Sequence, residues 1–358
     1  MLVLVATALS ALLPVAPADA DEVRDLQWHL RFLDVAAAHR ISQGTGVVVA
    51  VVDTGVDAAH PDLTGNVLPG VDFVDEGGNG QRDEDGHGTG MAGLVAAHGR
   101  ASAGALGIAP QAKILPIRIA RASSSRFGDH GLEGLSWAVA HGANIICFAN
   151  VISDTPQLRQ VIERTRAADV VVVAAVGNRP TAGKVEFPAA YRGVLAAAGV
   201  DQNGNHAQVS VTGPEVVLAA PAVDIVSTSQ GGRYRKGTGT SDAAAILAGA
   251  AALVRAKFPN LSAEEVIHRL TATAIDKGTP GRDGEYGYGV VDLVAALTKD
   301  VPPLKPASQP PVTSAPPAGS PASNGHPKPV AVIVAIVTVL VVVGAVGTLV
   351  AVRRRQAS

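Results

Sequence analysis

The sequence contains little cysteine, few aromatic residues and little charge. Cys147 is the one cysteine among 358 residues, aromatic residues make up 3% and charged residues 17%. A lone cysteine cannot form a disulfide within its own chain, so a disulfide-stabilised scaffold is excluded. The formal net charge is −2 and no basic patch stands out in the body of the chain, which disfavours nucleic-acid binding. Hydrophobic residues, by contrast, make up 47%, and they are unevenly distributed.

The first apolar segment has features of an export signal. Residues 1–20 contain no lysine or arginine and end in Ala18-Asp19-Ala20, a small-x-small cleavage pattern. We therefore expect a signal peptide that is removed on export. The basic residues that normally open such a peptide are missing, and an uncleaved membrane anchor is the alternative interpretation.

The second apolar segment, residues 330–352, carries no charge. As a helix it would span about 34 Å, which exceeds the roughly 30 Å hydrocarbon core of a membrane. The tail that follows, residues 353–358, begins with three arginines, and the positive-inside rule places it in the cytoplasm. The sequence thus predicts one C-terminal transmembrane helix in the cell membrane, with the preceding part of the chain extracellular.

The region between these segments predicts one large domain. Residues 301–329 contain ten prolines, which is typical of an extended linker. Residues 44–300 are long enough to bury a core without disulfides. They follow an N-terminal extension, residues 21–43, in which Trp28 favours packing against the domain; a short propeptide is the alternative.

Short apolar runs rich in valine and isoleucine alternate with longer amphipathic segments in this domain. This alternation predicts an α/β fold with a mostly parallel central sheet covered by helices on both faces. The expected strands are Val47–Val52, Lys113–Ile119, Asn144–Phe148, Val170–Val176 and Val194–Val200, and the expected helices are Gly88–Ala97, Gly131–His141, Pro156–Ala168 and Asp242–Ala256. Ligands of such sheets gather at the carboxyl ends of the strands, so the residues that follow these runs are the first candidates for a site.

Four residues at such positions have side chains suited to catalysis. Asp53 ends one strand and Asn178 follows another, while His87 and Ser241 each stand at the start of a helix. Taken singly, each has an ordinary structural explanation as a turn, loop or capping residue. Together they match the needs of a serine nucleophile, which requires a base and a carboxylate to orient that base. Asn178 would donate to an oxyanion, as would backbone N–H groups at the helix start.

The blocks that contain these residues resemble the subtilisin-like serine protease family. They read VAVVDTGVDAAHPDL, DGHGTGMAGLVAA, LGIAPQAKILPIRI, VVVAAVGN, VDIVSTSQGGRY and GTGTSDAAA. The resemblance implies a subtilisin-like three-layer sandwich, a catalytic triad of Asp53, His87 and Ser241, and Asn178 as the oxyanion donor.

More narrowly, the chain resembles the mycosins, membrane-anchored subtilases associated with type VII secretion. The N-terminal block DLQWHLRFLDVAAAHRISQGTGV, the phrase HPDLTGNVLPGVDF and the order of leader, protease, proline-rich linker and membrane helix carry this resemblance. It implies a protein substrate, which a type VII system secretes, and contact with a membrane secretion complex.

The sequence also departs from the family pattern. Subtilases usually carry a Ser-x-Gly-Gly-like segment that pairs with the substrate backbone, and Phe148, Ala149 and Asn150 stand at the substrate-binding positions here. A Phe148 ring that points into the substrate cleft would narrow or block the pocket, whereas a ring that points into the core would favour an active enzyme; the sequence leaves both directions open. Asp242 places a carboxylate next to the nucleophile, and Ala245 replaces a family proline. Mycosins generally carry paired cysteines, which this chain lacks.

Two functions remain from the sequence. The first is an active serine endopeptidase that hydrolyses peptide bonds through an acyl-enzyme. The second is a weak or inactive subtilase scaffold that stabilises a membrane secretion complex, and the departures from the family pattern motivate it. The protease chemistry requires no cofactor or metal; some subtilases bind structural calcium, but no complete ligand set is identifiable here.

Overall fold

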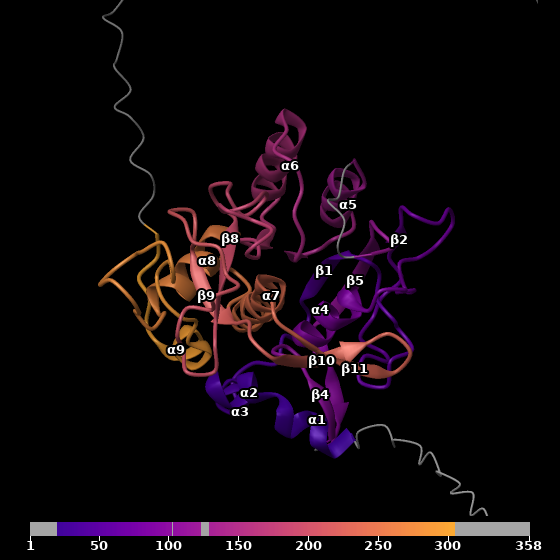
Figure 1. Ribbon diagram of the computed structural model, residues 1–358, viewed down its shortest axis with the longest axis horizontal. Coiled ribbons are helices and arrows are strands. Elements are labelled where there is room, and N and C mark those ends of the chain that lie inside the picture. Colours follow the sequence, from indigo (N-terminus) through magenta and orange to yellow (C-terminus); the bar gives the residue numbers. More distant parts are fainter. Residues whose placement is uncertain (1–19, 102, 123–128, 305–358) are drawn as a thin grey trace, which may run out of the picture. The chain divides into compact units, whose positions relative to one another are not determined.

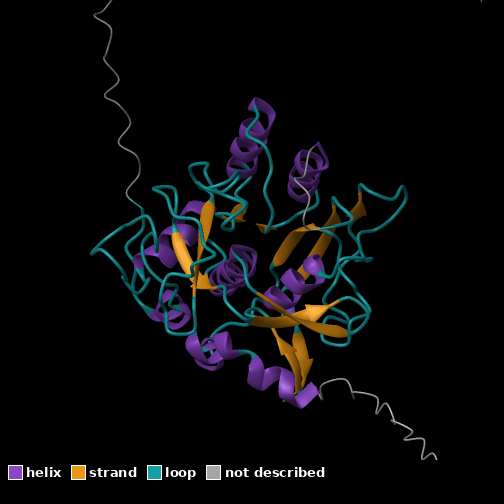
Figure 2. Cartoon of the chain, viewed as in Figure 1, coloured by secondary structure: helices purple, strands orange, loops and turns teal. Residues whose placement is uncertain are grey.

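The computed structural model describes residues 20–101, 103–122 and 129–304. Their centre is a sheet of seven strands in the order β2-β5-β1-β6-β7-β8-β9, and every neighbouring pair in it is parallel (Figures 1 and 2). The strands are β1 Val48–Asp53, β2 Val71–Asp72, β5 Lys113–Arg118, β6 Ile145–Phe148, β7 Val171–Ala175, β8 Leu195–Val200 and β9 Leu218–Pro221. The predicted α/β fold with a mostly parallel sheet is therefore confirmed.

Helices cover both faces of this sheet. One face is packed against α4 and α7, and the other against α5 and α6. The bounds of the helices are α1 Ala20–Leu26, α2 Trp28–Phe32, α3 Val35–His39, α4 His87–Ala96, α5 Asp129–Ala140, α6 Pro156–Ala167, α7 Thr240–Lys257, α8 Ala263–Ala272 and α9 Leu293–Thr298. Two further strand pairs are antiparallel: β3 His98–Arg100 with β4 Ala103–Leu106, and β10 Ile225–Ser229 with β11 Arg233–Gly237.

The alternation of side chains along the strands creates two separate cores. Cys147 of β6 belongs to the core beneath α4 and α7, whereas its neighbour Phe148 belongs to the core beneath α5 and α6. Successive strand residues point to opposite faces, so a strand buried on both sides must be apolar throughout. This requirement explains the continuous valine and isoleucine runs in the sequence.

Helix α7 lies at the middle of the molecule and is almost entirely buried. Its first three turns consist largely of alanine, which lets the helix approach β6, β7, β8 and β9 closely. Ala245, at the position of the family proline, is fully buried in a continuous helix. A helix of such small residues forms because alanine has the highest helix propensity and its short side chain fits the narrow space over the sheet.

The strand order fixes where a site can form. From β1 the chain builds the sheet toward β5 and β2, and then crosses to the other side of β1 to place β6 there. This reversal separates the loops that follow β1 and β6 and opens a crevice at their carboxyl ends. Asp53 is the last residue of β1, and Asn150 follows β6 by two residues.

The three N-terminal helices pack against the domain. The Gln27 amide donates to the carbonyls of Leu106 and Val226 at 3.1 and 3.2 Å, and the Trp28 indole donates to the Val223 carbonyl at 3.0 Å. The extension thus joins the β3–β4 pair to the β10–β11 pair (Figure 1).

The C-terminal predictions fall outside the described residues. The chain divides into two units, residues 1–304 and 305–358, and the second unit contains the predicted transmembrane helix. Among the residues that the structure describes, none of the helices is long and apolar enough to span a membrane.

Candidate active site

Asp53 is buried at the end of β1, with hydrogen-bond donors around its carboxylate. His87 Nδ1 lies 2.8 Å from Oδ1 and 3.0 Å from Oδ2, the Thr54 N–H donates to Oδ1 at 2.8 Å, and the Asn150 amide donates to Oδ2 at 2.7 Å. Burial by itself would raise the pKa of Asp53, but the charge of His87 and these hydrogen bonds hold it below its ordinary value. Asp53 is therefore a carboxylate at neutral pH.

His87 is the first residue of α4 and lies between two glycines, Gly86 and Gly88. Gly86 has a φ of 94°, a left-handed conformation that favours glycine. At Gly88 a Cβ would lie 2.1 Å from the Gly55 carbonyl oxygen, so only glycine lets α4 begin this close to β1. Burial acts to lower the pKa of His87, yet the Asp53 carboxylate outweighs it and holds the pKa above its ordinary value. This pairing orients the ring and leaves its second nitrogen for other chemistry.

Asp83 organises the loop that presents His87, a role that our sequence analysis missed. Its Oδ1 accepts hydrogen bonds from the Thr54 hydroxyl and from the backbone N–H groups of Asp85 and Gly86, at 2.9 to 3.0 Å. Its Oδ2 accepts from the backbone and the hydroxyl of Thr89. The signal in the sequence is an aspartate four residues before a helix-starting histidine, where a carboxylate satisfies unpaired N–H groups.

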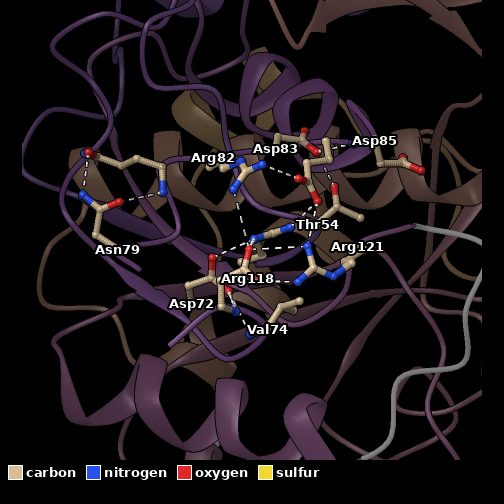
Figure 3. Close-up of polar contacts among 12 residues, drawn as sticks. Thr54, Asp72, Val74, Asn79, Arg82, Asp83, Asp85, Arg118 and Arg121 are labelled. Atoms are coloured by element: carbon tan, nitrogen blue, oxygen red, sulfur yellow. Dashed lines mark hydrogen bonds and ion pairs between the residues drawn. The ribbon is translucent and has the colours of Figure 1, made fainter. Parts of the chain in front are cut away.

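An arginine ties the same loop to the edge of the sheet. Arg118, at the end of β5, is fully buried and forms ion pairs with Asp72, Asp75 and Glu84 at 2.7 to 2.8 Å. Figure 3 shows Arg118 between Asp72 and Arg121, with Asp83 and Thr54 close by. Within residues 20–101, 103–122 and 129–304, no group of three or more metal-ligating side chains is placed to hold an ion. The carboxylates that gather here surround a guanidinium.

Ser241 and Asn178 approach each other at the start of α7. The side-chain oxygen Oδ1 of Asn178 accepts from the backbone N–H and the hydroxyl of Thr240, at 2.9 and 3.0 Å. A Cβ built on Gly239 would lie 3.2 Å from both Asn178 Nδ2 and Ser241 Oγ, so glycine leaves space between these two atoms. Since the amide oxygen is engaged with Thr240, the Asn178 N–H₂ group is the end that faces the serine.

His87, Asn178 and Ser241 line one cavity of about 470 Å³. Its other lining residues are Ala149, Asn150, Val151, Ala175, Gly177, Thr181, Ala182, Glu186, Arg235, Thr238 and Thr240. Among the described residues, no hydrogen bond joins His87 to Ser241. Catalytic hydrogen bonds are often long in the absence of substrate and tighten in the complex. The wall of the cavity therefore carries a serine hydroxyl, an imidazole and an amide N–H₂ group.

The three predicted substrate-binding residues have different positions. Ala149 and Asn150 line the cavity. The Phe148 side chain is 0% exposed and packs beneath α5 and α6, away from the cavity lining. The ring therefore points into the core, the direction that favours an active enzyme, because Phe148 is still a strand residue and its side chain alternates to the face opposite Cys147. Its predicted place among the substrate-binding residues is not confirmed. Asn150 is also more than a lining residue, since its amide holds Asp53.

Asp242 lies directly after Ser241 and is almost fully buried, with 1% of its side chain exposed. Arg235 of β11 contacts its Oδ1 at 3.2 Å, while Oδ2 has no hydrogen-bond partner among the described residues. Burial raises the pKa of Asp242, and the positive charges of Arg235 and His87 act against that rise. The contact between Arg235 and Asp242 was not predicted from the sequence.

Comparison with known proteins assigns the chain to a family. Residues 44–289 match the subtilase family. Mycosin-1 of Mycobacterium tuberculosis strain H37Rv is 36% identical over 343 residues, which cover 80% of this chain and 76% of Mycosin-1. Subtilisin DY of Bacillus licheniformis is 37% identical over 258 residues, covering 71% of this chain and 92% of that protein.

Solved structures agree with this assignment. The crystal structure of MycP1 with its N-terminal propeptide removed matches with a TM-score of 0.70 and 31% identity, covering 77% of this chain and 98% of MycP1. The structure of MycP3 protease from the type VII (ESX-3) secretion system matches with a TM-score of 0.65 and 32% identity, covering 76% of this chain and 88% of MycP3. The chain therefore belongs to the subtilase family of serine endopeptidases and is related to the mycosins of type VII secretion systems.

Proposed function

We propose that the chain is a membrane-anchored extracellular serine endopeptidase in which Asp53, His87 and Ser241 form the catalytic triad. The observation that carries this proposal is the contact of His87 Nδ1 with the buried Asp53 carboxylate, at 2.8 Å, in the wall of a cavity that Ser241 also lines. With Nδ1 held by the carboxylate, the free imidazole nitrogen is Nε2, and a base in this tautomer accepts a proton from a serine hydroxyl.

The first half of the reaction forms an acyl-enzyme. Ser241 Oγ attacks the carbonyl carbon of the substrate as its proton passes to His87 Nε2. The carbonyl oxygen becomes an oxyanion, to which Asn178 Nδ2 and the Ser241 backbone N–H donate. The C–N bond then breaks and the proton on His87 passes to the leaving amine.

The second half restores the enzyme. Water attacks the acyl carbon, gives one proton to His87, and forms a second oxyanion held by the same donors. The bond to Ser241 Oγ breaks, the proton returns to the serine, and the peptide acid leaves. Asp53 keeps its negative charge throughout and stabilises the imidazolium. No cofactor takes part in either half.

The cellular setting of this activity follows from the sequence and from the mycosin relatives. The apolar segment 330–352 and the arginines after it support a single-pass anchor with the peptidase domain outside the cell membrane. MycP1 and MycP3 both come from type VII secretion systems, ESX-1 and ESX-3. Both support a protein substrate that such a system exports, and contact with its membrane complex.

A second candidate function is a scaffold with little or no proteolysis. The observation in its favour is the buried Asp242 next to Ser241, because a negative charge there opposes the oxyanion. The burial of Phe148 removes the other main argument for it, since no aromatic ring fills the cavity.

Labelling with a fluorophosphonate probe separates the two functions. Full-length protein in detergent should label at Ser241 and hydrolyse peptides, and Ser241→Ala should lose about 10⁶ in turnover, the size of loss known for subtilisin. Labelling of the wild-type chain no greater than that of Ser241→Ala would reject the protease. Export that survives Ser241→Ala but fails when the whole protein is deleted would favour the scaffold.

A further inference from the structure

The side chain of Arg235 reaches the active site through a gap that two glycines leave open. A Cβ on Gly90, one turn into α4 from His87, would lie 2.8 Å from both Cδ and Nη1 of Arg235. A Cβ on Gly237 would lie 2.3 Å from Arg235 Nη2 and 2.9 Å from Asp242 Oδ2. Any other residue at either position would displace the guanidinium, so the two glycines shape the passage in which Arg235 meets Asp242.

The charges around His87 come from four directions. Asp53 of β1 contacts its ring, and Asp85 of the preceding loop accepts from its backbone N–H at 3.2 Å. Arg235 of β11 lines the same cavity as the ring, and Asp242 of α7 lies behind Ser241. The positive charge of Arg235 and the negative charge of Asp242 act on His87 in opposite senses.

We propose that Arg235 is a positioning residue of the active site, which holds and neutralises the Asp242 carboxylate so that its charge does not act on His87 or on the oxyanion. The inference rests on the proposed function for its catalytic consequence, but the charge balance around His87 is a property of the folded chain. It also explains how this chain can carry an aspartate directly after Ser241, because Arg235 compensates the charge of that aspartate.

Three variants of the full-length protein test this balance by removing the charge of Arg235, the charge of Asp242, or both. In Arg235→Gln, Asp242 is left uncompensated, so the pKa of His87 should rise and the acid limb of kcat/KM should move up by about one pH unit. Its kcat/KM at neutral pH should fall about tenfold. In Asp242→Asn the uncompensated charge is that of Arg235, so the acid limb should move down. The double variant should return to the wild-type pH midpoint.

The control is Lys236→Gln, the neighbouring residue on β11, whose side chain is 62% exposed and pairs with Asp224. It removes one positive charge from the same strand without touching Asp242 and should leave the acid limb in place. If Arg235→Gln fails to fold, the other two variants still test the proposal, since neither leaves a buried carboxylate unpaired. The pH midpoint of Asp242→Asn should then lie below that of the double variant.

A direct titration of His87 keeps the proposal independent of activity. The Cε1–H resonance of ¹³C-labelled histidine, assigned by its loss in His87→Asn, reports the ionisation of the ring in each protein. Opposite shifts in Arg235→Gln and Asp242→Asn that cancel in the double variant support the proposal, even if the wild-type chain fails to label with the probe and the proposed protease is rejected. Coincident titrations in Asp242→Asn, the double variant and the wild type would overturn it.

Discussion

Asn150 joins the cavity to the proposed triad. Its amide donates to Asp53 Oδ2 at 2.7 Å, and its side chain also lines the cavity. A hydrogen bond to a charged group contributes about 1.5–3 kcal/mol, more than a bond between neutral groups. Asn150 therefore helps to fix both the charge and the direction of the Asp53 carboxylate.

Replacing Asn150 with leucine should lower kcat while changing KM little. Leucine has nearly the size of asparagine but cannot donate, so Asp53 loses one of its hydrogen bonds and holds His87 less firmly. We expect kcat to fall about tenfold, measured by peptide hydrolysis. Val151→Ala is the matched control, because Val151 lines the cavity without contacting Asp53. An equal rise in KM for both variants, with kcat unchanged, would show that Asn150 only shapes the cavity.

We propose separate roles for the two polar atoms of the Asn178 side chain: Oδ1 accepts from Thr240, and Nδ2 donates to the oxyanion. Two variants should therefore differ in their effects on stability and on kcat. Asn178→Ala loses both atoms, so kcat should fall by about 10²–10³ and the melting temperature should also drop, because Thr240 loses its acceptor. Asn178→Asp keeps an acceptor for Thr240 but cannot donate to the oxyanion. It should keep the melting temperature and lose at least as much kcat. If Asn178→Asp retained the wild-type kcat, Asn178 would not be the oxyanion donor.

At the scale of elements, the N-terminal helices contain a buried histidine. His29 of α2 is 0% exposed, and neither ring nitrogen has a hydrogen-bond partner among the described residues. Burial lowers its pKa to about 3. In the unfolded chain the ring has its ordinary pKa of 6.5 and takes up a proton at a pH where the folded chain does not. Stability is therefore fully present above pH 6.5 and is lost as the pH falls toward 3.

His29→Leu should remove this pH dependence. Between pH 6.5 and 5 the free energy of unfolding should fall by about 2 kcal/mol more in the wild-type chain than in His29→Leu. The reason is that the unfolded wild-type chain binds a proton at His29 in this pH range, whereas the folded chain does not. Urea unfolding at the two pH values measures the difference. His130→Gln is the control, since its side chain is 53% exposed. A wild-type chain that loses no more stability than His29→Leu would contradict the assignment.

The elements that the sequence analysis located are those with a continuous apolar signal. All five predicted strands occur in the central sheet, and the helix predicted over Asp242–Ala256 is α7, Thr240–Lys257. Strand β9, Leu218–Pro221, was not predicted, because four residues with two alanines and a proline give a weak signal. Helix α8 was not predicted either, although Ser262 and Glu265 form a capping box that marks its start.

The site was less fully predictable than the fold. Asp53, His87 and Ser241 were candidates because each ends a strong strand or stands at the start of a helix, and their catalytic roles stay a prediction. The role of Asp83 has a local signal, its place four residues before a helix-starting histidine, which was overlooked. The roles of Asn150 and Arg235 depend on side-chain contacts with Asp53 and Asp242 that form only when different elements of the fold meet. The direction of the Phe148 ring stayed open in the sequence for a similar reason: the direction of a side chain at a strand end depends on where the strand stops.

At the scale of the whole molecule, we predict that the proposed membrane anchor, residues 330–352, can be removed without loss of the peptidase activity. Deletion of residues 330–358 should release an active peptidase into the medium, because the charges and apolar length needed to hold the chain at a membrane lie in that segment. Cell fractionation with a peptide assay measures this. Deletion of residues 353–358 alone is the comparison, and it should keep the protein in the membrane fraction. A truncated protein that stays with the membrane would point to another anchor, the leader included.

Helix α7 has a consequence for the time at which the enzyme becomes active. The sheet face that carries Val49, Ile145 and Val171 is covered by this helix, which comes from residues 240–257 and brings Ser241 with it. A growing chain that stops before this helix therefore lacks both Ser241, the proposed nucleophile, and the cover of its main core. If Ser241 is the nucleophile, the core is completed and the serine added in one event, so a partial chain should carry no proteolytic activity toward the machinery that makes it.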